Sequence, residues 1–240
     1  MNGWILRGLR GGILTTRYPQ EVPSMPSLYR GRVLALEASP EAQNQGASAC
    51  LTGAIAPGPA IAAIDERRCF QCGECVRRAP EAFAMRNDIE VAQPAKLLPT
   101  GCRFGRSIHV RHVDAGSDAS CEQELAAIFN PYYDANRLGV FLTASPRRAD
   151  ILLVTGVVAE PMKEPLQRVY AAMPLPKRVV AVGTAACSGG LFAHSACVAG
   201  PVDTVLPVDV YLPGAPPPPL AILYAILLAA GRLQPSEVGR

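Results

Sequence analysis

Residues 149–158 read ADILLVTGVV, a short run of mostly branched apolar side chains interrupted by a glycine. Residues 177–186 read KRVVAVGTAA and show the same pattern of an apolar run followed by glycine. Continuous apolar runs of this length are typical of strands that are buried on both faces, as they are in parallel sheets. The two runs therefore predict buried parallel strands.

Helical spacing surrounds these two predicted strands. Residues 122–129 (EQELAAIF) and 164–173 (EPLQRVYAAM) have the apolar spacing of helices, and the apolar run from Leu220 predicts a terminal helix. Residues 202–212 (VDTVLPVDVYL) are expected to be extended. Strands that alternate with helices predict an α/β fold with an open, doubly wound sheet.

Length and composition exclude several classes of protein. The chain has 240 residues, enough for one large or two small domains, and its net charge of +3 is too small to indicate nucleic acid by itself. The longest apolar stretch, residues 220–231, is far shorter than the roughly 20 residues that a membrane-spanning helix needs. We therefore expect no nucleic-acid partner and no direct membrane span.

The distribution of the 8 cysteines indicates a metal-stabilised segment. The start of the chain lacks the pattern of a secretion signal, which favours a reducing, cytosolic location where thiols serve metals more often than disulfides. Residues 35–104 combine most of the cysteines with little continuous apolar pattern. A segment this small rarely builds a sufficient core by itself, so we expect a metal or a cluster to stabilise it.

Residues 1–34 are basic and irregular. They fit either a solvated tail or a strap that lies on a partner. The apolar side chains that would supply the strap's contacts are Trp4, Ile5, Leu6, Leu9, Ile13 and Leu14.

The sequence CFQCGEC places Cys69, Cys72 and Cys75 in a C-x2-C-x2-C run. This spacing wraps a short loop so that three thiolates point at one centre, and a cubane iron–sulfur cluster then needs a fourth ligand. A closing Cys-Pro would begin four residues later, where the chain has Ala79 followed by Pro80. The segment resembles a bacterial-type two-cluster ferredoxin domain.

In two-cluster ferredoxins the fourth cysteine of each motif binds the cluster held mainly by the other motif. Cys50 stands where the closing cysteine of a first motif would be, and the remaining positions of that motif are Pro40, Gln43 and Gly46. With Ala79, one cluster site has thus lost every ligand, and we expect a single [4Fe–4S] cluster at the other. The ligands of that remaining cluster would be Cys50, Cys69, Cys72 and Cys75.

Two alternatives remain open for this half of the chain. Leu51 follows Cys50 in place of the usual proline, and Cys102, in LLPTGCRFG, is the rival fourth ligand, as in single-cluster ferredoxins with a distant closing cysteine. A structural zinc site is the second alternative, because four thiolates also suit Zn²⁺. Zinc motifs usually pair two C-x2-C knuckles, whereas three thiols share one run here.

Four stretches of the second half carry a further resemblance, namely residues 105–117 (GRSIHVRHVDAGS), 131–156 (PYYDANRLGVFLTASPRRADILLVTG), 173–183 (MPLPKRVVAVG) and 200–214 (GPVDTVLPVDVYLPG). In this order they are similar to the 20-kDa iron–sulfur subunit of complex I and to the matching small subunit of group 4 membrane-bound [NiFe] hydrogenases, including formate hydrogenlyase. The opening MNGWILRGLRGGILTTRYP resembles hydrogenase-type members that carry a fused ferredoxin domain.

The resemblance implies the fold and its division into domains. A flavodoxin-like open parallel sheet would be preceded by a small α+β ferredoxin-like domain. The implied parts are an N-terminal strap over residues 1–34, the ferredoxin-like [4Fe–4S] domain over 35–104 and the α/β domain over 105–240.

That family holds one [4Fe–4S] cluster in its α/β domain, beside the large subunit. Its four cysteines stand in G-S-C-x-x-C-E, G-x-C-x-x-x-G-G and P-G-C-P-P, where this chain has Asp118, Cys121, Ala185 and Ala215. Because alanine offers no lone pair to an iron atom, we expect this proximal site to hold no iron.

The remaining thiols of the second half have other interpretations. A mixed metal site from Asp118, Cys121, Cys187 and His194 is one alternative, since these residue types suit zinc. Otherwise Cys121, Cys187 and Cys197 are interpreted as small buried hydrophobes. The stretch GTAACSGG lacks the G-K-[ST] ending of a phosphate loop.

The resemblance also implies a function. We expect an iron–sulfur subunit of a complex-I-like or hydrogenase-like assembly, peripheral on the cytoplasmic side of the cell membrane. Its partners would be a large-subunit homologue and membrane antiporter-like subunits. With one cluster kept and the proximal cluster lost, its role would be largely structural or confined to a shortened electron path, with no catalytic residues of its own. The alternatives are an active electron-transfer subunit of a NADH:quinone oxidoreductase or hydrogenase, and a free ferredoxin-like carrier.

Overall fold

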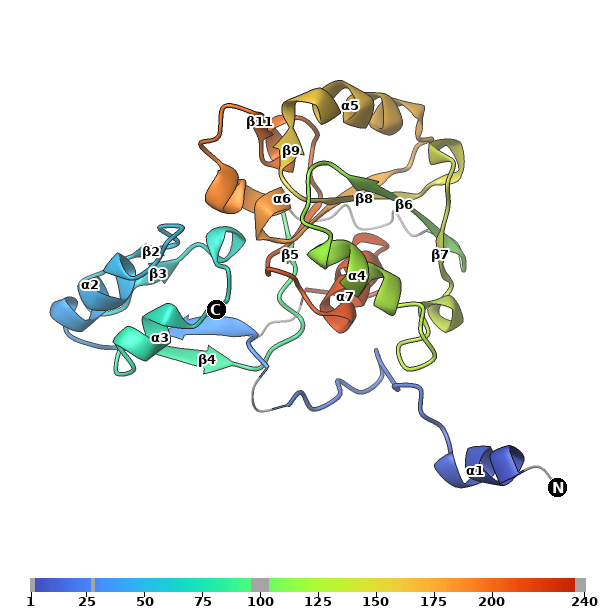
Figure 1. Cartoon of the computed structure of the whole chain (residues 1–240), viewed down its shortest axis with the longest axis horizontal. Coiled ribbons are helices and arrows are strands. Elements are labelled where there is room, and N and C mark those ends of the chain that lie inside the picture. The colour runs from blue at the N-terminus through green and yellow to red at the C-terminus, as the bar shows by residue number, and fades with distance from the viewer. Residues whose placement is uncertain (1–2, 27–28, 96–103, 236–240) are drawn as a thin grey trace.

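The computed structural model describes residues 3–26, 29–95 and 104–235. Figure 1 shows a small unit beside a larger α/β unit. The chain begins with a separate helix, α1 (Gly3–Gly11), and an extended N-terminal segment leads from this helix to the small unit. The small unit consists of β1 (Arg32–Ala35), α2 (Pro40–Ser48), β2 (Ile55–Ala56), β3 (Ala63–Ile64), α3 (Glu74–Arg78) and β4 (Phe83–Arg86).

A six-stranded sheet forms the centre of the larger unit, in the order β5-β12-β10-β8-β6-β7. Its strands are β5 (Gln93–Pro94), β6 (Ile108–Asp114), β7 (Val140–Leu142), β8 (Ile151–Thr155), β10 (Arg178–Val182) and β12 (Val210–Leu212). The last five pair in parallel, and β5 joins β12 antiparallel at one edge. Counted from β6, the parallel strands lie in the order 2-1-3-4-5, which is flavodoxin-like. The predicted α/β fold is confirmed.

Helices cover both faces of this sheet (Figure 1). The helices of the larger unit are α4 (Ser120–Ala127), α5 (Lys163–Ala172), α6 (Thr184–Ser188) and α7 (Pro219–Ala229), and a two-stranded ribbon pairs β9 (Val158–Ala159) with β11 (Val198–Gly200). One core contains α4 and α7 side chains, and the other contains those of α5 and α6. Every residue of α7 is buried, which agrees with a helix that is apolar on all sides.

The structure corrects two expectations about the strands. Residues 202–212 are not extended throughout, because Val202–Thr204 forms a 3-10 helix and only Val210–Leu212 is a strand. The central strand β6 was not predicted, because its sequence IHVRHVD has no continuous apolar run. Its apolar side chains at Ile108, Val110 and Val113 are buried while the polar ones between them are half-buried.

Helix α2 of the small unit begins where the local sequence favours a helix start. The Ser39 side chain accepts a hydrogen bond from the Ala42 N–H at 3.3 Å, and Pro40 occupies the first turn of α2, both of which are typical of a helix start. Gln43 is fully buried on this helix. Its side-chain amide donates to the Ala38 carbonyl at 3.0 Å and accepts from the Gly58 N–H at 3.0 Å.

Close packing fills the region around the positions that the ferredoxin resemblance left without thiols. Ala79 is fully buried, as is Phe83. A Cβ added at Gly46 would lie only 2.2 Å from the Phe83 ring. These small and neutral side chains therefore form core in this part of the small unit.

Gly46→Ala is expected to destabilise the small unit by about 1–3 kcal/mol, the usual cost of overpacking a core. Alanine gains about 1 kcal/mol in helix propensity, but the Phe83 ring has no exposed side toward which it can move. Chemical denaturation of the purified protein measures the change. Gly8→Ala, where an added Cβ meets nothing within 4 Å, is the matched control, and an unchanged midpoint for Gly46→Ala would refute the packing argument.

The N-terminal segment joins the α/β unit through residues 15–18. The Thr16 N–H donates to the Tyr132 carbonyl at 2.9 Å, and the Arg137 guanidinium donates to the carbonyls of Thr16 and Tyr18 at 3.0 Å each. Tyr18 is fully buried in the core that contains α7. Among the described residues, no helix has both the length and the apolar content to span a bilayer.

Candidate metal centre

The four cysteines expected to bind a cluster share one cavity. Cys50, Cys69, Cys72 and Cys75 all line a cavity of about 580 Å³ at the boundary between the small unit and the α/β unit. Cys50 follows α2, Cys69 and Cys72 lie in the loop before α3, and Cys75 lies on α3. The structure thus brings together residues that are up to 25 positions apart in the sequence.

Backbone N–H groups already point at two of these sulfurs. The Ala54 N–H donates to Cys50 Sγ at 3.3 Å, and the Gln71 N–H donates to Cys69 Sγ at 3.4 Å. Gln71 and Gly73 adopt left-handed backbone conformations, with φ of 57° and 74°, which turns the loop around the cavity. Hydrogen bonds to cysteine sulfur are one of the means by which proteins tune iron–sulfur clusters. The donor set therefore fits a thiolate-bound cluster.

The electrostatics of the thiols support the same grouping. Burial raises the pKa of Cys69 to about 11, while the Gln71 N–H lowers it and the neighbouring Cys75, Cys50 and Cys72 raise it further. Burial is also the main reason for the raised pKa of Cys75. Without a positive centre the Cys69 thiol would stay protonated at neutral pH, and a metal is the centre that deprotonates thiols outright.

The alternatives to a four-cysteine cluster stand as follows. Cys102 lies outside the described residues. Within the part of the chain that the structure describes, no three His, Cys, Asp or Glu side chains converge closely enough to hold a single metal ion. Leu51, which replaces the usual proline, is 85% exposed at the rim of the cavity.

A second cavity, of about 280 Å³, lies where strand ends meet in the α/β unit. It is lined by the positions of all four family ligands, which are Asp118, Cys121, Ala185 and Ala215. These positions follow β6, β10 and β12, at the carboxyl edge of the sheet where open α/β folds bind ligands. The cavity has kept its place in the fold, but its lining offers one thiol and two methyl groups, which does not suit a cubane.

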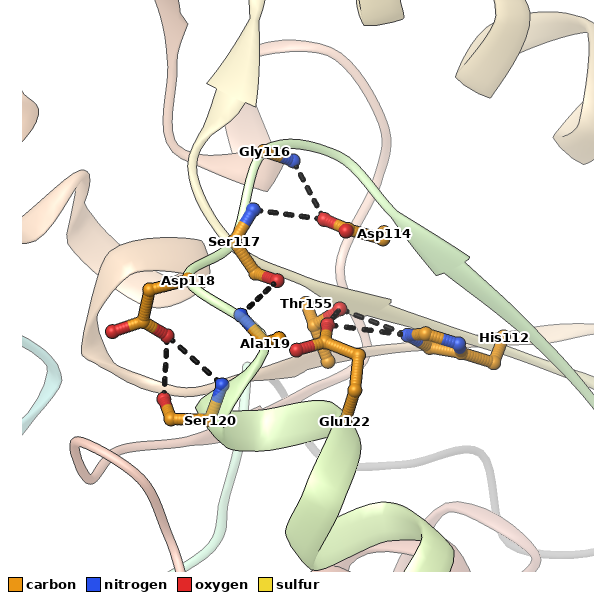
Figure 2. Close-up of polar contacts among 9 residues, drawn as sticks. All are labelled: His112, Asp114, Gly116, Ser117, Asp118, Ala119, Ser120, Glu122 and Thr155. Carbon is orange, nitrogen blue, oxygen red and sulfur yellow. Dashed lines mark hydrogen bonds and ion pairs between the residues drawn. The ribbon is translucent and has the colours of Figure 1, made fainter.

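Figure 2 shows that the loop carrying Asp118 is held by its own hydrogen bonds. One Asp114 carboxylate oxygen accepts from the Gly116 and Ser117 N–H groups at 2.9 and 2.8 Å. The Asp118 carboxylate accepts from the Ser120 hydroxyl at 2.6 Å and from its N–H at 3.0 Å, and these bonds lower the pKa of Asp118. The Asp118 carboxylate thus stabilises the local turn.

A polar cluster lies next to this loop (Figure 2). Thr155 donates a short hydrogen bond to Glu122, and His112 Nε2 lies 2.8 Å from the Thr155 hydroxyl and 3.6 Å from Glu122. Burial lowers the pKa of His112, against the opposing effect of Glu122. His112 therefore joins β6 to β8 through its hydrogen bond with Thr155, and Thr155 in turn donates to Glu122 on α4.

The two cavities are neighbours, which sequence reasoning missed. Phe70 and Ala215 line both of them, and the Thr184 hydroxyl donates to the Cys69 carbonyl at 3.0 Å. Phe70 also packs near Gly190, where an added Cβ would lie 3.3 Å from the ring. No motif signalled these contacts, because they join loops more than 110 residues apart.

The cysteines outside the first cavity differ in exposure. Cys121 and Cys187 are buried, in agreement with their interpretation as small hydrophobes, whereas Cys197 is exposed and that expectation is wrong for it. Gly183 allows the close approach of Cys121, because a Cβ on Gly183 would lie 2.8 Å from the sulfur.

Iodoacetamide at pH 8 is expected to modify Cys197 rapidly and to leave Cys121 and Cys187 unmodified in the folded protein. Burial, followed by the charge of Glu122, raises the pKa of Cys121 to about 12, so its thiolate fraction at pH 8 is on the order of 10⁻⁴. Burial also raises the pKa of Cys187. Peptide mass spectrometry after timed quenching measures the rates, and equal labelling of Cys121 and Cys197 would contradict this account.

Comparison with known proteins identifies the α/β unit. The profile of the family described as NADH ubiquinone oxidoreductase, 20 Kd subunit, matches residues 119–229. A probable membrane-bound hydrogenase subunit, mbhJ of Pyrococcus furiosus, is 44% identical over 150 residues, which cover 62% of this chain and 90% of that protein. The chain belongs to this 20-kDa subunit family.

A second relative agrees with this assignment, and one solved structure aligns with a low TM-score. Formate hydrogenlyase subunit 7 of Escherichia coli is 44% identical over 132 residues, or 55% of this chain, but this span is only 52% of that relative's length. A solved chain of the membrane-bound sulfane sulfur reductase, an archaeal respiratory membrane complex, aligns with a TM-score of 0.47 at 26% identity, covering 55% of this chain and 73% of that one. The family profile itself does not reach the cysteine-rich segment.

Proposed function

We propose that this chain is an iron–sulfur subunit of a membrane-associated complex-I-like or group 4 hydrogenase-like assembly. It keeps one [4Fe–4S] cluster and lacks the proximal cluster of the α/β unit. The observation that carries the proposal is the single cavity lined by Cys50, Cys69, Cys72 and Cys75, with N–H donors directed at two sulfurs. When bound, a cluster there would supply one-electron transfer.

The proposal divides the chain into three parts, the strap (1–34), the cluster-binding domain (35–104) and the α/β domain (105–240). β5 supports a fixed relation between the last two, because it follows the small unit and pairs with β12 of the sheet. The Glu66 carboxylate, which pairs with Arg32 at 3.2 Å, also accepts a hydrogen bond from Gln93 on β5. The small unit is thus tied to the sheet through its own residues.

The contact between the two cavities favours a shortened electron path over a purely structural role. In the proposed assembly, the retained cluster would lie one layer of side chains, Phe70 and Ala215, away from the proximal position. The Thr184–Cys69 hydrogen bond holds that layer in place. The chain's own residues would therefore hold the retained cluster next to the proximal position of the α/β unit.

Partners and location follow from the relatives. Proteins similar to this chain carry names of membrane-bound hydrogenase and formate hydrogenlyase subunits. We accordingly infer a large-subunit homologue and membrane antiporter-like subunits as partners, with a peripheral position on the cytoplasmic side of the membrane.

Anaerobic purification followed by iron analysis and low-temperature EPR tests the proposal. The expected result is about four iron atoms per chain and one [4Fe–4S] signal after dithionite reduction. About eight irons with two interacting signals would instead support an electron-transfer subunit with a full cluster set. Stoichiometric zinc without iron would refute the cluster altogether.

A further inference from the structure

The N-terminal helix α1 stands away from both units of the protein (Figure 1), and none of its nine residues is buried. Trp4, Leu6 and Leu9 are 74%, 60% and 76% exposed. Beyond the helix, Ile13 and Leu14 are also largely exposed. Several large apolar side chains in one short segment are far more than the scattered single ones that surfaces normally carry.

The side chains of α1 separate into two faces. At the helical repeat of 3.6 residues, Ile5 and Leu9 lie above one another with Leu6 beside them. Arg7 lies on the opposite side, Arg10 borders Leu6 one turn away, and Trp4 lies at the border between Arg7 and Ile5. The helix is therefore strongly amphipathic, with an apolar face and a basic face.

Such a helix has little stability of its own in water. Isolated helices shorter than about 12–15 residues are marginal even in alanine-rich sequences, and Gly8 in the middle lowers helix propensity further. Since none of its residues is buried against the rest of the chain, a surface outside the described chain must supply its stabilising contacts.

The charge of the segment selects the kind of surface. No acidic residue precedes Glu21 in the sequence. Arg7 and Arg10 give α1 its positive charge, whereas Arg17 pairs with Glu21 at 3.3 Å. Basic amphipathic helices with leucine on the apolar face and tryptophan at its border are suited to the interface of a bilayer that carries anionic headgroups. We propose that α1 lies in the plane of an anionic membrane surface, with Leu6 and Leu9 toward the acyl chains.

The connection to the α/β unit makes this helix a tether. Residues 15–18 are fixed on the α/β unit by the Thr15 hydroxyl, which donates to the Pro131 carbonyl at 2.8 Å, and by buried Tyr18. Only residues 12–14 separate this attachment from the end of α1. Membrane binding by α1 would therefore hold the α/β unit close to the bilayer, whether or not the cluster is present.

Trp4 provides the test, because it is the only tryptophan of the chain. The full-length protein is mixed with phosphatidylcholine vesicles, with or without about 30% phosphatidylglycerol, near physiological salt. On the anionic vesicles we expect co-sedimentation and a blue shift of Trp4 emission. Arg7→Gln with Arg10→Gln should weaken binding by about 30-fold, and Leu6→Asp with Leu9→Asp should abolish it.

Leu175→Asp is the matched control, since Leu175 is 84% exposed on the α/β unit and should leave vesicle binding unchanged. The variant with Leu6→Asp and Leu9→Asp should keep the iron content of the parent protein, which separates this inference from the proposed cluster. Equal binding to vesicles without anionic lipid would overturn the anionic surface as the partner. Unshifted Trp4 emission would overturn membrane binding altogether and leave a protein partner for the apolar face of α1.

Discussion

Cys75→Ser is expected to lower the iron content of the purified protein from about four atoms per chain to fewer than one. Cys75 lies on α3, is buried, and lines the cavity that the other three thiols share. A serine hydroxyl keeps the size of the side chain but does not supply the thiolate that iron needs. Because the small unit has few large apolar side chains in its core, loss of the cluster should also unfold this unit.

Iron analysis, EPR and limited proteolysis measure these effects together. Cys197→Ser is the control, because Cys197 is exposed and lies outside both cavities, and it should retain all the iron. Cys50→Ser and Cys102→Ser then decide the fourth ligand. We expect the first to lose the cluster and the second to keep it. A fully loaded Cys75→Ser protein would refute the proposed site.

Restoring three cysteines in the second cavity is expected to double the iron content, from about four to about eight atoms per chain. The variant combines Asp118→Cys, Ala185→Cys and Ala215→Cys with the native Cys121. All four positions line the same cavity of about 280 Å³ at the carboxyl ends of the strands. The substitution of Asp118 removes its two hydrogen bonds with Ser120, which lie on an exposed turn. The loop should therefore tolerate the change.

A matched variant shows whether the gain needs all four thiols. The same triple substitution with Cys121→Ser leaves three thiols in the cavity and should bind less iron than the triple variant alone. EPR should show two interacting signals only when all four are present. If the triple variant folds but still holds about four irons, the cavity has lost the shape of the family site as well as its ligands.

Local patterns in the sequence were sufficient for much of the fold. The apolar runs at 149–158 and 177–186 predicted β8 and β10, because a strand buried on both faces has few alternatives to branched apolar residues. The strand β6 was not predicted, because its polar side chains interrupt the apolar run. The prediction that residues 202–212 are extended was wrong in part, because three of these residues form a 3-10 helix.

For the site, the sequence by itself determined that Cys69, Cys72 and Cys75 lie close together, because a C-x2-C-x2-C spacing separates them by only a few residues. It also showed which family thiols are missing, because that requires only the identity of each residue. The crossed-ligand rule of two-cluster ferredoxins pointed to Cys50 as the partner of those three cysteines, and the structure places Cys50 at the same cavity. Only the tertiary structure placed Phe70 and Thr184 between that cavity and the second one. Contacts between segments so far apart depend on how the small unit packs on the sheet, and no local periodicity encodes that packing.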